Sequence, residues 1–86
     1  MQGVRDVMSR VVRIHVGVSR ELQTKLEAGS ISIGDFTHAI GLSQVDTARL
    51  KDFGILTGDA EVERLDDIRK RTGIDFIEED HSRRAM

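Results

Sequence analysis

Cysteine, proline, tryptophan and tyrosine are absent from this 86-residue sequence, and phenylalanine occurs only three times. Without cysteine the chain has neither a disulfide framework nor a thiolate metal site, so we expect a reducing, cytoplasmic location. No stretch approaches the ~18 uncharged apolar residues that a membrane span requires, and no N-terminal run is apolar enough for a signal peptide. A chain of this size supports one small domain with a modest core, for which oligomerisation is the remaining stabiliser.

Catalytic and metal-binding motifs are also missing from the sequence. The three histidines, His15, His38 and His81, are widely separated and show none of the spacings typical of zinc ligands. No P-loop, dinucleotide fingerprint or nucleophile elbow is present. We therefore expect no enzyme activity, no cofactor and no bound metal.

Charge is distributed unevenly along the chain. The formal net charge is −2, which is less basic than nucleic-acid-binding domains usually are. Residues 1–51 carry seven basic and five acidic side chains, whereas residues 52–86 carry six basic and ten acidic ones. The basic half could therefore face a phosphate backbone while the acidic part points away.

The spacing of apolar residues predicts an all-α, mainly helical domain over residues 1–77. Residues 1–29 read as an N-terminal helix with an apolar stripe about half its circumference wide. Residues 33–56 form a helix-turn-helix-like unit, residues 60–72 a C-terminal helix, and residues 78–86 a flexible charged tail. The wide stripe packs either on the following helices or on a second copy of the chain, so we expect a homo-oligomer, most simply a dimer.

A second interpretation of the N-terminal segment stays open. Residues 12–18 alternate apolar and polar side chains and are rich in β-branched residues, which is typical of a short strand. Ser19 then provides a capped helix start. This segment resembles the opening of ribbon-helix-helix repressors, although less chain follows it before the next helix than that family uses.

The helix-turn-helix-like unit is defined by capping residues and glycines. Gly29 ends the first helix, and Ser32 caps a second one that Gly41 terminates. Ser43 is expected to start a third helix, which Gly54 closes. Two short helices joined by such a turn form a helix-turn-helix arrangement, in which one helix supports a second that lies in a DNA groove.

Residues 33–36, Ala39, Gly41-Leu42-Ser43 and Gly54-Ile55-Leu56 together resemble the first two helices of MerR-like and excisionase-type winged-helix DNA-binding proteins. Thr37 and Thr47 depart from the usual helix-turn-helix pattern. The resemblance implies a DNA-binding transcriptional regulator in which the second helix reads bases and neighbouring side chains contact phosphates. The implied DNA-binding residues are Gln44, Val45, Thr47, Arg49 and Lys51, with Arg13 and Arg20 near phosphates.

An alternative function belongs to a different class. The apolar face of residues 4–26 and the acidic C-terminal third could instead engage another protein, which would make the chain an interaction adaptor or antagonist. Residues 74–77 are a further apolar segment that either covers the core or docks on a partner. A DNA reader needs its arginines free beside the second helix, whereas an adaptor needs an exposed apolar surface.

Overall fold

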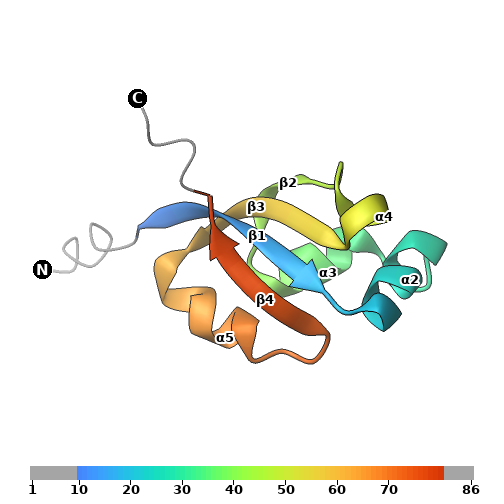
Figure 1. The fold of residues 1–86 in the computed structure, drawn as a ribbon. Helices are drawn as coiled ribbons and strands as arrows, with labels where there is room; N and C mark the ends of the chain where they lie inside the picture. Colours follow the sequence, from blue (N-terminus) through green and yellow to red (C-terminus); the bar gives the residue numbers. More distant parts are fainter. Residues whose placement is uncertain (1–9, 81–86) are drawn as a thin grey trace, which may run out of the picture.

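The computed structural model describes residues 10–80 as one four-stranded antiparallel sheet with short helices packed against it (Figure 1). The elements, in chain order, are β1 (Val11–Val18), α2 (Arg20–Ala28), α3 (Ile33–Ile40), β2 (Ser43–Asp46), α4 (Leu50–Phe53), β3 (Ile55–Glu61), the 3-10 helix η1 (Val62–Arg64), α5 (Leu65–Arg69) and β4 (Ile74–Glu79). The all-α prediction is therefore wrong, because strands form the centre of an α/β domain.

The strands lie in the order β2-β3-β1-β4, and all neighbours are antiparallel. It follows that β1 and β2 run parallel with β3 between them, and that β3 and β4 run parallel with β1 between them. Helices α2 and α3 connect the first of these pairs, and η1 and α5 connect the second. This is the β-α-β-β-α-β connectivity of two interleaved, split βαβ units.

The N-terminal helix predicted for residues 1–29 is wrong over residues 11–18, where the open alternative of a strand is confirmed. Five of these eight residues are β-branched, and such side chains lose rotamer freedom in a helix but pack well in a sheet. The dense apolar run satisfied helical and strand spacing together, so spacing alone did not separate them. Residues 1–9 of the predicted helix lie outside the described residues.

Both helices after β1 begin and end at the capping residues expected from the sequence. The Ser19 hydroxyl accepts a hydrogen bond from the amide of Leu22 at the start of α2, and Gly29 ends this helix with φ 83°. The Ser32 hydroxyl caps α3 in the same way, and Gly41 ends it with φ 82°. A left-handed residue at this position favours glycine, which explains why these boundaries were predictable.

The prediction fails after Gly41, where the second helix of the helix-turn-helix-like unit is replaced by β2. Ser43 does not cap a helix but pairs with Asp59 of β3, and its hydroxyl lies 3.4 Å from the Asp59 carbonyl oxygen. The chain turns helical only in the four residues of α4, after an Asp46 carboxylate oxygen has accepted a hydrogen bond from the amide of Ala48. Pairing with β3 has overridden the local helix signals.

The helix predicted over residues 60–72 is also shorter than expected. Strand β3 continues through Glu61 because Ala60 is buried on the core side of the sheet opposite Val12. Helical residues are confined to η1 and α5, and Ile68 is the buried anchor of α5. Gly73 follows with φ 95°, and residues 74–79 form an edge strand.

The core lies between one face of the sheet and the helices. Ile14, Val16 and Leu56 point into it from the strands and are fully buried. The other buried apolar residues include Leu22, Leu26, Ile40 and Ile68, which come from α2, α3 and α5. Figure 1 shows the strands in front of α3, so this helix packs behind the sheet. Among the described residues, no helix is both long and apolar enough to cross a membrane.

Gly58 offers a test of this packing because it faces the core where α3 leads into β2. A Cβ atom at this position would lie 2.7 Å from Leu42 Cγ and 2.9 Å from the Ser43 carbonyl oxygen. Since a backbone atom cannot move aside cheaply, we predict that Gly58→Ala lowers the free energy of unfolding by about 1–3 kcal/mol. Chemical denaturation followed by circular dichroism measures this change.

Gly34→Ala is the matched control. Gly34 is exposed in α3, and an added Cβ atom would meet only the Ser32 hydroxyl oxygen at an ordinary 3.7 Å. This substitution should raise the free energy of unfolding by about 0.5–1 kcal/mol, because alanine favours a helix over the unfolded chain. Equal effects of the two substitutions would contradict the packing at Gly58.

Candidate functional site

The side of the sheet opposite the core carries no covering helix within residues 10–80, and we call it the open face. Side chains alternate between the two sides of a strand, so every second residue belongs to this surface. The antiparallel register then aligns these residues in rows across the strands. The open face consists of Val11, Arg13, His15 and Gly17 of β1, Ile55, Thr57, Asp59 and Glu61 of β3, and Phe76 and Glu78 of β4.

One end of the open face is apolar. Gly17 stands between Phe76 on β4 and Ile55 on β3 in the strand register. The Phe76 ring lies over Gly17, because a Cβ atom built on this glycine would be only 2.2 Å from Phe76 Cε2. Phe76 nevertheless remains 42% exposed on its other side. We call Gly17, Ile55 and Phe76 the apolar end.

Next to the apolar end lies a row of hydrogen-bonded polar side chains. His15 Nδ1 and the Thr57 hydroxyl share a hydrogen bond of 2.9 Å. His15 Nε2 lies 3.7 Å from a carboxylate oxygen of Asp80, and Glu78 is the register partner of His15 on β4. These contacts hold the imidazole between Thr57 and Asp80. No three side chains among residues 10–80 are grouped so that they could hold a metal ion.

A second polar row is centred on Arg13. Its Nη1 atom donates to a carboxylate oxygen of Asp59 at 2.9 Å and to the carbonyl oxygen of Gln44 at 3.2 Å. The two charged side chains are 22% and 29% exposed, so water screens the ion pair only in part. Arg13 thus ties β1 to both β3 and β2 and has less freedom to contact a phosphate than its sequence position suggested.

The polar part of the open face carries more acid than base. Asp59, Glu61 and Glu78 belong to the surface and Asp80 borders it, against one arginine and one histidine. Asp59 is paired with Arg13, and Glu61 lies 3.8 Å from Arg64 Nε. Such a surface repels the phosphates of nucleic acids and attracts a basic partner.

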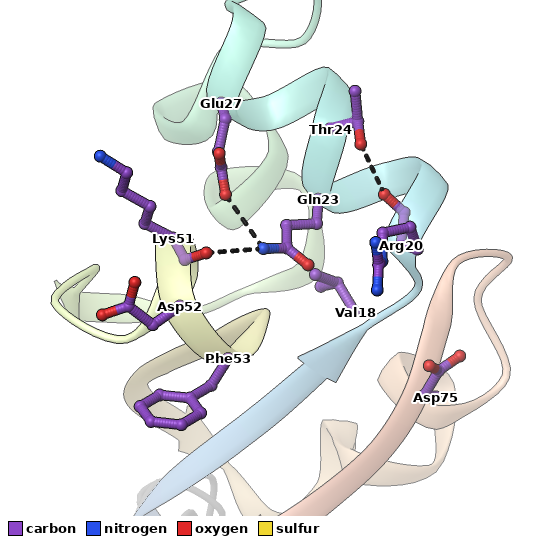
Figure 2. Close-up of a pocket in the computed structure, with 9 residues that line it drawn as sticks. All are labelled: Val18, Arg20, Gln23, Thr24, Glu27, Lys51, Asp52, Phe53 and Asp75. Atoms are coloured by element: carbon purple, nitrogen blue, oxygen red, sulfur yellow. Dashed lines mark hydrogen bonds between the residues drawn. The ribbon is translucent and has the colours of Figure 1, made fainter.

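A groove of about 580 Å³ lies between α2 and α4 (Figure 2). Gln23 spans it: its amide nitrogen donates to the carbonyl oxygens of Leu50 and Lys51 and to a carboxylate oxygen of Glu27. This amide therefore caps the C-terminal end of α4. The other lining residues are Val18, Arg20, Thr24, Asp52, Phe53 and Asp75. Arg20 and Lys51 are brought to one groove, but they share it with three carboxylates.

The remaining residues expected to contact DNA do not form a recognition helix. Gln44 and Val45 lie in β2, where Gln44 is exposed with φ 49° and Val45 packs partly against the core. Thr47 is exposed in the turn after β2, and Arg49 is the exposed residue before α4. Lys51 is exposed within α4. DNA binding by these residues stays a prediction, but the recognition helix that it assumed is absent from residues 43–49.

The apolar end was missed from the sequence as a site. The alternation of residues 12–18 did indicate which side chains would leave the core, and Gly17 is one of them. Because glycine has no side chain, this position leaves room for the side chain of a neighbouring strand, here Phe76. The sequence predicts that residues 74–77 either cover the core or dock on a partner, and in the structure different residues of this segment face the two sides. Ile74 and Ile77 pack against the core, whereas Phe76 lies on the open face.

The contact between Phe76 and Gly17 can be observed directly in solution. We predict that the Hα protons of Gly17 are shifted upfield in the proton NMR spectrum, because they lie beneath the Phe76 ring. Phe76→Leu should remove this shift while leaving the amide spectrum of the core unchanged. Gly17 resonances at ordinary glycine positions in the wild-type chain would show that the ring lies elsewhere.

Comparison with known proteins adds no assignment. No protein-family model, curated protein or solved structure matches this chain. The function is therefore inferred from the geometry and charge of the surfaces described above.

Proposed function

We propose that this domain binds another protein through its open face and acts as a non-catalytic adaptor or antagonist. The observation that carries the proposal is the exposed Phe76 ring, which lies over Gly17 beside Ile55 on the side of the sheet opposite the core. Aromatic side chains with one face fixed and the other exposed lose little entropy on binding and are enriched at interface centres. The polar rows around the apolar end supply the rim that such interfaces usually have.

The charges on the open face define the chemistry of the partner. Glu61, Glu78 and Asp59 lie on it, so a complementary surface carries lysine or arginine next to an apolar pocket that receives Phe76. The same charges disfavour pairing of two copies through this face. The expected homodimer would need another surface.

The charge pattern supports this proposal over the DNA-binding regulator. Nucleic-acid affinity depends on neutralising phosphates with lysine and arginine, whereas the open face is rich in carboxylates and its Arg13 is already paired with Asp59. Binding of single strands would need several stacking aromatics, and Phe76 is the only aromatic residue on the open face.

A catalytic function is less well supported, although three groups on the sheet follow the order of a hydrolase triad. Thr57, His15 and Asp80 supply a hydroxyl, an imidazole and a carboxylate in sequence. Thr57, however, is only 9% exposed. The backbone amides around it belong to central strands and are committed to the sheet, so they are not free to stabilise an oxyanion.

We also propose that the domain works in the cytoplasm. The reason is compositional: the chain contains no cysteine, so its stability does not draw on an oxidising compartment. The fold is instead closed by strand pairing at both edges of β1.

The proposal is tested by placing a photo-crosslinking phenylalanine analogue at position 76 in the full chain, with position 38 on the exposed surface of α3 as the control. A partner captured at position 76 and not at position 38 is then purified, and its affinity is measured by calorimetry. We predict that Phe76→Ala weakens binding at least tenfold, which corresponds to about 1.4 kcal/mol.

Phe53→Ala is the matched substitution, because Phe53 is 70% exposed but lies on α4 outside the open face. It should change the affinity less than about twofold. Unchanged binding of the Phe76 variant, or equal losses in both variants, would overturn the proposal. Binding of the wild-type chain to duplex DNA that weakens steeply with salt would favour the regulator instead.

A further inference from the structure

The outer edge of β4 has backbone groups that point away from the sheet. In an antiparallel pair, directly opposed residues alternate between bonded and non-bonded pairs. The amide of Asp80 donates to the Arg13 carbonyl oxygen at 2.8 Å, so Phe76 and Glu78 are the other bonded positions along β4. Ile77 and Glu79 therefore direct their amide and carbonyl groups outward. In the sheet formed by residues 10–80, β4 is an edge strand whose neighbour is β1.

The opposite edge of the sheet is less suited to pairing. Strand β2 has only four residues, and its register with β3 shifts between Ser43 and Asp46. Gln44 within it has φ 49°, which breaks the regular line of amides and carbonyls. Bulged, short edge strands are a common device against unwanted strand addition. Strand β4 has six residues; its register with β1 shifts between Gly17 and Val18, but four successive residues, Phe76 to Glu79, pair regularly with β1.

Charge selects among the strands that could pair with this edge. Asp75, Glu78 and Glu79 are all exposed, and Phe76 and Ile77 lie between them. A second copy of β4 would bring these carboxylates against one another, which is unfavourable across a strand pair. A segment in which lysine or arginine alternates with apolar residues can place its basic side chains on the open-face side, beside Glu78, and its apolar side chains on the other side, beside Ile77.

We infer that the outer edge of β4 accepts an extended, basic segment of a partner protein as a fifth strand. The new strand would exchange main-chain hydrogen bonds with Ile77 and Glu79, and its basic side chains would lie beside Glu78. This surface is distinct from the open face, so the inference does not depend on the proposed docking of Phe76. A partner that used both would place an extended segment along β4 and a globular surface on the open face.

The test uses a short synthetic peptide of alternating lysine and valine, with both ends blocked, and a glutamate-valine peptide as the charge control. The full chain is titrated with each peptide and followed by amide NMR and hydrogen exchange. We expect the lysine peptide to slow amide exchange at Ile77 and Glu79, because these groups gain hydrogen bonds. The amides of Phe76 and Glu78 are already bonded to β1 and should change little in exchange rate.

Two substitutions at one position separate backbone pairing from charge. Glu79→Pro removes an outward amide at an edge position where proline is tolerated, and Glu79→Gln removes the same charge but keeps the amide. We predict that the proline variant binds the lysine peptide at least fivefold more weakly than the glutamine variant. The exchange pattern of the wild-type chain provides the same information if the proline variant does not fold.

Three results would overturn the inference. Equal affinities of the two variants would show that the peptide is held by charge alone. Binding without added protection at Ile77 and Glu79 would show that no strand is formed. Loss of peptide binding in Phe76→Ala, with Glu79→Pro unaffected, would move the site to the open face and leave the proposed function intact.

Discussion

Strand β1 is the constraint on which the rest of the structure depends, because it pairs on both sides and separates two surfaces. Its backbone alternates between hydrogen bonds to β3 and to β4, and its side chains alternate between core and open face. Ile14 and Val16 thereby anchor the core, while His15 and Gly17 organise the surface opposite. A shift of one residue would place polar groups in the core, so the register is strongly specified.

The two surfaces proposed for partner binding follow from this arrangement, and they offer different chemistry. The open face offers a fixed aromatic ring with an acidic surround, so recognition there depends on side chains. The edge of β4 offers main-chain groups with regular spacing, so recognition there depends on an extended backbone. Phe76 belongs to β4 and to the open face, and it brings the two surfaces side by side.

Local signals predicted the parts of the fold that local chemistry controls. Ser19 and Ser32 satisfy helix amides, and Gly29 and Gly41 adopt positive φ, so the boundaries of α2 and α3 could be predicted from the sequence. The type of element after Gly41 could not. Residues 43–46 become a strand because β3 lies beside them in space, and the dense β-branched run of β1 fits two periods equally well until its partners are known. The open face depends on the same pairing and was therefore hidden as well.

The order of strands in the sheet also has a kinetic meaning. The central strand is the first in the described chain, and one of its two partners is the last. The core behind β1 can close fully only after β4 has arrived, so nearly the whole domain must be synthesised before the sheet is complete. Contacts between segments so distant in sequence slow folding. Until β4 arrives, β1, with its five β-branched residues, keeps one unpaired edge even after β3 has paired with the other, and unpaired strand edges are prone to aggregation.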